Sequence, residues 1–143
     1  MIRRFHPAEM ESLLALWLES TTLAHPFIAP SYWQESLDMV RNIYLPHART
    51  WVSAGPSALE GFISVLDQQF VGALFVAPGQ TGKGIGRALM QHVQQRFPLL
   101  SLEVYQRNHR AVAFYRARGF HIEDCAWQEE TRLPTWIMSW QGA

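Results

Sequence analysis

Three glycines at alternate positions are the clearest chemical feature of the sequence. Gly82, Gly84 and Gly86 lie within residues 76–89, with Lys83 between the first two. Glycine reaches backbone conformations that other residues avoid, and it leaves the neighbouring amides open to a ligand. This stretch therefore predicts a site where backbone N–H groups bind an anion, although a tight turn that needs glycine only for its geometry is the alternative.

An amphipathic helix is expected directly after the glycines. Apolar residues recur at four-residue intervals and a proline ends the pattern: Ile85, Leu89, Val93, Phe97 and Pro98. Such a pattern is typical of a helix with one buried face. The free N–H groups and the dipole at a helix N-terminus favour phosphate, so the glycine stretch is expected to bind a phosphorylated ligand.

The spacing of the glycines does not fit two other phosphate-binding loops. A Walker A loop would need glycine at Ala77 and Ser or Thr at Gly84, and the dinucleotide-binding loop would need glycine at Arg87. A nucleotide-binding module is therefore a weak alternative.

A second pattern lies in residues 102–120. Asn108 is followed by Ala111, by the pair Phe114 and Tyr115, and by Gly119 before Phe120. Asparagine is a preferred helix N-cap and glycine a common residue just after a helix, so a helix is expected over residues 108–118.

Together the two patterns resemble the GNAT family of N-acetyltransferases, and the resemblance extends over the whole chain. The family's glycine loop reads Arg or Gln, two residues, Gly, one residue, then Gly or Ala; this sequence departs from it with Thr81 at the first position. The resemblance implies acetyl-CoA as co-substrate and an amine as acceptor. Its pyrophosphate loop would comprise Gly82, Lys83, Gly84, Ile85, Gly86 and Arg87, and its pantetheine contacts Leu74, Val76 and Asn108.

The resemblance also implies the catalytic residues. Acetyl transfer needs a neutral amine, a stabilised oxyanion and a proton for the departing thiolate. Tyr115 is expected to protonate the sulfur, and Glu103, in the sequence Leu-Glu-Val, is expected to accept the proton of the amine. Plain structural roles are the alternatives: a surface-facing glutamate on a strand and a core aromatic on a helix.

The acceptor side is expected on the loop between the first two helices and at the start of one strand. The residues that the resemblance assigns to it are His25, Phe27, Tyr32, Trp33 and Phe70, with a structural role as the alternative for His25. Through the resemblance alone, lysine side chains of proteins are the leading acceptor. A protein N-terminus or a small amine is the alternative within the family, and an acyl-CoA sensor without catalysis is the alternative outside it.

The elements that must position these residues follow from hydrophobic periodicity. Strands are expected over residues 1–5, 49–54, 58–66, 69–76, 100–105, 120–128 and 133–140. Two early helices are expected on either side of a break at residues 21–30, before the helices after the glycine loop and over 108–118.

The predicted class is α+β with the GNAT acyl-CoA N-acyltransferase fold: a mixed, mostly antiparallel sheet of about seven strands flanked by four helices. The resemblance also implies that the fourth and fifth strands splay apart to admit the pantetheine arm, and Gly72 could ease a bulge there.

Composition narrows the function further. One domain over residues 1–143 with zero formal net charge offers no basic field for nucleic acid or membranes. The single cysteine permits no internal disulfide, and no apolar run has the length of a signal peptide or membrane span, so a cytoplasmic protein is expected. The six histidines show no ligand spacing, so no metal is expected. A monomer and a homodimer are both compatible with the sequence.

Overall fold

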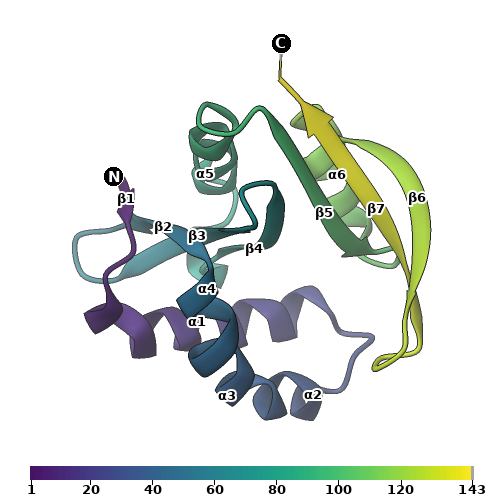
Figure 1. The fold of residues 1–143 in the computed structure, drawn as a ribbon. Helices are drawn as coiled ribbons and strands as arrows, with labels where there is room; N and C mark the ends of the chain where they lie inside the picture. Colours follow the sequence, from purple (N-terminus) through teal and green to yellow (C-terminus); the bar gives the residue numbers. More distant parts are fainter. Residues whose placement is uncertain (143) are drawn as a thin grey trace.

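One mixed sheet of seven strands organises the computed structural model, which describes residues 1–142 (Figure 1). The strands are β1 (Ile2–Arg4), β2 (Arg49–Ala54), β3 (Leu59–Leu66), β4 (Phe70–Val76), β5 (Leu99–Tyr105), β6 (His121–Gln128) and β7 (Leu133–Gln141). They lie in the order β1-β2-β3-β4-β5-β7-β6, and every neighbouring pair is antiparallel except β4 and β5. The predicted α+β class and GNAT-type sheet are confirmed.

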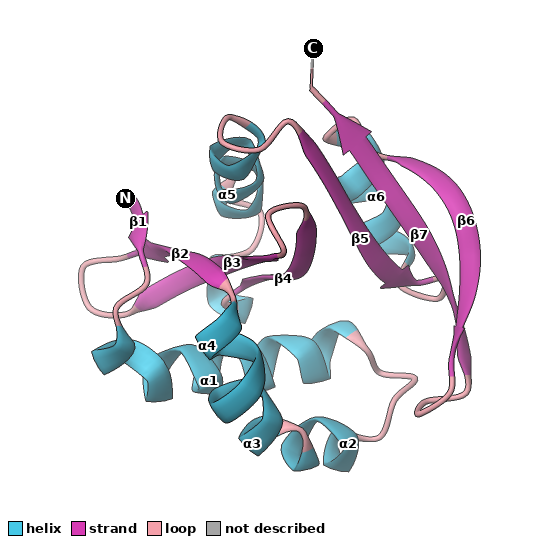
Figure 2. Cartoon of the chain, viewed as in Figure 1, coloured by secondary structure: helices cyan, strands magenta, loops and turns pink. Residues whose placement is uncertain are grey.

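Helices cover both faces of the sheet (Figures 1 and 2). The main ones are α1 (Met10–Ala24), α5 (Ile85–Gln94) and α6 (His109–Ala117), and short 3-10 turns η1 (Pro7–Glu9) and η3 (Pro78–Gln80) precede α1 and α5. A helical segment over residues 30–47 is interrupted and comprises α2 (Pro30–Glu35), α3 (Leu37–Met39), the π-helical turn η2 (Val40–Tyr44) and α4 (Leu45–His47). Counted as one, it completes the four predicted helices.

Each face of the sheet has its own apolar core. The face toward α5 and α6 buries Leu89, Val93 and Met138, whereas the face toward α1 and the 30–47 segment buries Leu13 and Phe62. Alternation along the strands supplies both cores, since successive strand side chains point to opposite faces. Because both of its faces are covered, strand β3 has a run of consecutive buried residues in its middle.

Helix α1 is longer than its sequence pattern predicts. It continues to Ala24, so the predicted break at residue 21 is wrong and the chain leaves the helix only at His25. Thr21 is 1% exposed, and its carbonyl oxygen accepts a hydrogen bond from His25 Nδ1 at 2.7 Å. Tertiary packing of this last turn outweighs the low helix propensity of two successive threonines.

Strands β4 and β5 separate almost as soon as they meet. Their one registered pair is Phe70 with Ser101, where the Ser101 N–H donates to the Gln69 carbonyl at 2.7 Å. On the other edge of β4, Ala73 and Val71 pair with consecutive β3 residues, which leaves Gly72 as an extra residue. The predicted splay and the bulge at Gly72 are both present.

Leu89 offers a test of the α5 side of the core. It is fully buried, so Leu89→Ala should lower the free energy of unfolding by about 2–5 kcal/mol through lost apolar burial and a cavity. Met39→Ala is the control, because Met39 is 54% exposed and its truncation should change stability by less than about 0.5 kcal/mol. Urea unfolding of both variants measures the difference; equal values would contradict the assigned core.

Candidate active site

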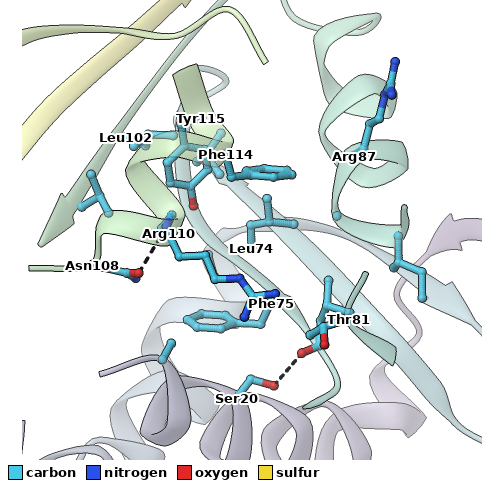
Figure 3. A pocket seen from close by; sticks show the side chains of 18 of the residues that line it. Ser20, Leu74, Phe75, Thr81, Arg87, Leu102, Asn108, Arg110, Phe114 and Tyr115 are labelled. Atoms are coloured by element: carbon cyan, nitrogen blue, oxygen red, sulfur yellow. Dashed lines mark hydrogen bonds between the residues drawn. The ribbon is translucent and has the colours of Figure 1, made fainter. Parts of the chain in front are cut away.

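The separation of β4 and β5 opens a cleft of about 800 Å³, here called the β4–β5 cleft (Figure 3). Five parts of the chain line it: the end of α1, strand β4, the glycine loop with the start of α5, strand β5 and the first turns of α6. Of the predicted residues, those that line the cleft are Leu74, Val76, Gly82, Gly84, Ile85, Gly86, Arg87, Glu103, Asn108 and Tyr115.

The glycine loop leaves its backbone open to this cleft. Gly82 and Gly84 have φ values of +79° and +81°, and a Cβ atom added at either would meet nothing within 4 Å. Gly84 is the N-cap residue of α5, so the free N–H groups of the first turn of this helix belong to the same loop. These positions therefore require glycine for conformation, while the space beside them is empty of protein.

The side chains of the loop differ in whether they face the cleft. Lys83 is exposed, donates to Gln80 Oε1 at 3.0 Å and is not among the lining residues, so the structure does not bring it into the cleft. Thr81, which stands where the family pattern has Arg or Gln, lines the cleft, and its hydroxyl donates to the Pro78 carbonyl at 3.3 Å. Of the two cationic residues predicted for the loop, Arg87 lines the cleft and Lys83 does not.

Tyr115 enters the cleft from α6. Figure 3 shows its hydroxyl directed into the space beside β4. Burial raises the pKa of Tyr115 to about 12, so the phenol keeps its proton at neutral pH. Asn108 begins the same helix and caps it, since its Oδ1 accepts a hydrogen bond from the Ala111 N–H at 3.2 Å. The cap fixes the start of the helix that carries Tyr115.

Glu103 reaches the cleft from the opposite face of the sheet. Its neighbours Leu102 and Val104 are buried in the core beneath α5 and α6, so the alternation of β5 turns Glu103 toward the side of α1. Thr135 on β7 donates a hydrogen bond to its carboxylate at 2.5 Å. Tyr115 and Glu103 thus approach one opening from two sides.

Four of the five predicted acceptor residues gather around the end of α1. His25 is 7% exposed, and its ring centroid lies 5.7 Å from Phe27 and 5.1 Å from Trp33. Tyr32 stacks edge-on against Trp33 at 4.9 Å. Phe70 lies apart from these ring contacts, at the closed end of the cleft where it pairs with Ser101.

His25 is held in one tautomer. Its Nδ1 lies 2.7 Å from the Thr21 carbonyl oxygen, which can only accept, so Nδ1 carries the proton. Burial lowers the pKa of His25, and the ring is therefore neutral at physiological pH. A structural role therefore accounts for His25, which is the C-cap residue of α1 and donates this hydrogen bond.

Several residues that sequence reasoning missed join the site. Tyr105 lies 5.4 Å from the His25 ring and 5.8 Å from Phe27, and Glu130 accepts a hydrogen bond from the Tyr32 hydroxyl at 3.1 Å. Tyr105 stands two residues after Glu103 on the same face of β5, a period-2 signal available in the sequence. The pairing of Tyr32 with Glu130 spans 98 residues and had no local signal.

Arg110 was also missed. It extends from the first turn of α6 across the cleft in Figure 3, and it lines the cleft. A cation in the first turn of a helix opposes the helix dipole, so this position gives Arg110 no local stabilising role. Ser20, on the other wall, donates to the Val76 carbonyl at 3.1 Å and ties α1 to the end of β4.

Two further properties concern residues 1–142 only. In this part of the chain, no group of three or more histidine, cysteine, aspartate or glutamate side chains is arranged to hold a metal ion. None of its helices has the length and apolar character needed to cross a membrane.

Comparison with known proteins places this geometry in a family. Residues 9–140 match the model of the acetyltransferase (GNAT) domain. Over 140 residues, 98% of this chain and 96% of the relative, the sequence is 55% identical to the peptidyl-lysine N-acetyltransferase YiaC of Escherichia coli K12. It is 36% identical over 121 residues to the peptidyl-lysine N-acetyltransferase YjaB of the same strain, covering 85% of this chain and 82% of YjaB.

Solved structures share the architecture. The solution structure of apo YjaB from Escherichia coli superposes with a TM-score of 0.84 at 32% identity, covering 100% of this chain and 98% of that one. The PaiA N-acetyltransferase of Thermoplasma acidophilum, solved in complex with coenzyme A, gives a TM-score of 0.82 at 20% identity, covering 99% and 98% of the two chains. The open sheet, the glycine loop and these relatives agree: the chain belongs to the GNAT family and is an N-acetyltransferase.

Proposed function

We propose that this enzyme transfers the acetyl group of acetyl-CoA to lysine side chains of proteins, by direct attack of the amine in a ternary complex. The observation that carries the proposal is the β4–β5 cleft, in which an unpaired strand edge, bare loop amides and the Tyr115 hydroxyl face one space. Lysine is favoured as acceptor because two relatives of this chain, YiaC and YjaB, are named peptidyl-lysine N-acetyltransferases.

Acetyl-CoA would bind along the cleft from the loop to the closed end. Its pyrophosphate suits the free N–H groups at the start of α5, with Gly82 and Gly84 leaving room and Arg87 adding charge. Its pantetheine arm suits the edge of β4 near Leu74 and Val76, where an extended ligand can replace the missing strand. Asn108, at the cap of α6, faces the same space from the other wall.

The reaction then divides among groups on opposite sides of the sheet. Glu103, directly or through a water molecule, takes a proton from the lysine ammonium, and the neutral nitrogen attacks the thioester carbon. A backbone N–H near Leu74 stabilises the oxyanion of the tetrahedral intermediate. When the C–S bond breaks, Tyr115 donates its proton to the sulfur, and the nitrogen loses the proton that the amide cannot keep, to water or to the Tyr115 phenolate. Glu103 then releases its proton to bulk water.

The high pKa of Tyr115 is compatible with this role. A phenol with a pKa of about 12 is a weak acid in water. A thiolate released in the same dry surroundings is also poorly solvated, and its proton affinity rises for the same reason. Desolvation therefore acts on donor and acceptor alike, while it keeps Tyr115 protonated until the sulfur needs the proton.

The acceptor side supports a long cationic side chain. The rings of Phe27 and Tyr105 form an apolar wall that suits the methylene stem of lysine, and Glu103 lies two residues from Tyr105 on the same face. At the outer edge, Glu130 holds Tyr32 by a hydrogen bond of 3.1 Å. These groups form the proposed entrance for the acceptor.

The first test identifies the acceptor. Acetyl-CoA is incubated with folded proteins, lysine peptides and small amines, and acetylation is mapped by mass spectrometry for wild type and for Tyr115→Phe. Lysine acetylation by wild type should fall about 10²-fold or more in the variant, since a general acid contributes at least this much. The variant should keep its affinity for acetyl-CoA. Modification of small amines or N-termini alone would contradict the lysine proposal, and binding without turnover would indicate a sensor.

A second test addresses the proton acceptor. Glu103→Gln keeps the shape of the side chain and a partner for Thr135 but removes the base. The acidic limb of the pH–rate profile reports loss of activity as the base is protonated, so this limb should disappear in the variant while turnover falls. A variant whose profile keeps the wild-type acidic limb would remove Glu103 from the proposed role.

A third test addresses the glycine loop. Gly84→Ala places a Cβ atom on a residue with φ of +81°, which costs roughly 1–2 kcal/mol and disturbs the loop amides. The dissociation constant of acetyl-CoA should rise about tenfold by calorimetry. Gly79→Ala is the matched control, since Gly79 lies outside the left-handed region and an added Cβ meets nothing within 4 Å. Equal affinities of the two variants would argue against pyrophosphate binding at Gly84.

A further inference from the structure

The glycine in the β4 bulge is required by space rather than by conformation. Gly72 has no β3 partner, because Ala73 pairs with Ser64 and Val71 pairs with Val65. Its φ is not among the positive values found for glycines of residues 1–142, so an alanine could adopt the same backbone. A neighbour must therefore exclude the side chain.

That neighbour is the tip of Tyr44. A Cβ atom added at Gly72 would overlap the Tyr44 hydroxyl oxygen and would lie 2.8 Å from Cζ and 3.0 Å from Cε2. Contacts this short do not persist, so either β4 or the tyrosine would have to move. Gly72 also lines the β4–β5 cleft, and a shift of this residue changes the cleft directly.

Packing against the core fixes the position of Tyr44. It lies on the π-helical turn η2 and packs against the core cluster of α1, which includes Leu13 and Phe62. π-helical turns inside α-helices are rare and occur often at functional sites. This turn places the ring so that its hydroxyl points at the bulge instead of at solvent.

In this position the Tyr44 hydroxyl does not stabilise the fold. Within residues 1–142 it is buried without a hydrogen-bond partner, and the nearby Ser64 hydroxyl is paired with Thr50 at 2.8 Å. Burial raises the pKa of Tyr44 well above its ordinary value, and hydrogen bonding with Ser64 opposes the rise, although the Ser64 hydroxyl lies outside the geometry of a full hydrogen bond to Tyr44. A buried unpaired hydroxyl reduces stability, so a phenylalanine would suit the core better. The oxygen therefore needs a reason other than stability.

We propose that Tyr44 is a positioning residue whose hydroxyl, pressed against Gly72, sets the path of β4 at the bulge and thereby the place of the thioester in the β4–β5 cleft. This inference rests on the proposed binding of acetyl-CoA in the cleft. The bulge lies at the closed end, between the one β4–β5 pair at Phe70 and the strand edge at Leu74. An error of about 1 Å in the position of reacting groups can cost 10²-fold in rate, so contact with the bulge is a sensitive control point.

A double-mutant cycle tests the contact. Tyr44→Phe should lower kcat about fivefold to tenfold while the dissociation constant of acetyl-CoA stays within about twofold and Tm does not fall, because only an unpaired hydroxyl is lost. Gly72→Ala should lower kcat about 10²-fold and lower Tm, because its methyl group overlaps the hydroxyl. The double variant removes the oxygen, which is the closest overlap, but leaves ring carbons at 2.8 and 3.0 Å from the methyl group, contacts that a small shift of the ring can relieve. Its kcat should therefore recover in part and exceed that of Gly72→Ala about threefold or more.

The same four proteins can overturn the inference. If the fold-loss of kcat in the double variant equals the product of the two single fold-losses, the residues act independently. If Tyr44→Phe has the wild-type kcat, the hydroxyl has no role in catalysis. If Gly72→Ala does not fold, a folded double variant supports the contact and an unfolded one contradicts it. Gly79→Ala controls for adding a methyl group to a glycine and should keep the wild-type Tm. An inactive wild-type enzyme would contradict the proposed function; additive losses in an active one contradict only the role of Tyr44.

Discussion

The site depends on a strand pairing that is left incomplete. Strands β4 and β5 meet at Phe70 and Ser101 and then diverge, so the facing backbone groups of both strands lack their ladder partners. Backbone N–H and C=O groups of a sheet are normally paired, and an unpaired strand edge is a ready template for an extended ligand. The cleft, the proposed pantetheine contact and the approach of the proposed catalytic groups all follow from this one interruption.

Contacts of β4 help to keep the interruption open. Val71 of β4 shares the core beneath α5 with Leu100 and Leu102 of β5, whereas Ala73 and Phe75 of β4 pack against the core beneath α1. Ser20 ties the end of β4 to α1 at 3.1 Å, and Gly72 rests against Tyr44 near the other end. Strand β4 is thus held at its end and at its bulge, and an opening fixed in this way is pre-organised for a ligand.

Burial, more than charge, shifts the pKa values of the groups around the cleft. The chain has no net charge, and desolvation is the largest cause of the pKa shifts of two residues near the site, Tyr115 and His25. Both remain neutral at physiological pH, one as a protonated phenol and the other as a neutral imidazole. Since Glu103 approaches from the opposite face, the open sheet lets an acid and a carboxylate reach one space without lying next to each other.

Local patterns in the sequence predicted the elements and much of the cofactor side. Glycine spacing, helix periodicity and the Asn108 cap are short-range features, because backbone conformation and hydrogen bonding are decided within a few residues. Gly72 was correctly placed at the bulge for the same reason. The end of α1 was misjudged because burial of Thr21, which depends on distant partners, outweighed its helix propensity.

The acceptor side and the shape of the cleft were decided only by tertiary structure. The bond between Tyr32 and Glu130, the contact of His25 with Tyr105 and the overlap of Tyr44 with Gly72 join residues far apart in the chain. No periodic pattern in the sequence predicts contacts of this kind, because they depend on how the helices pack on the sheet. The sequence by itself determined the family, the succession of strands and helices along the chain, and the loop with its exposed amides. Only the packed structure determined which side chains share the space beside it.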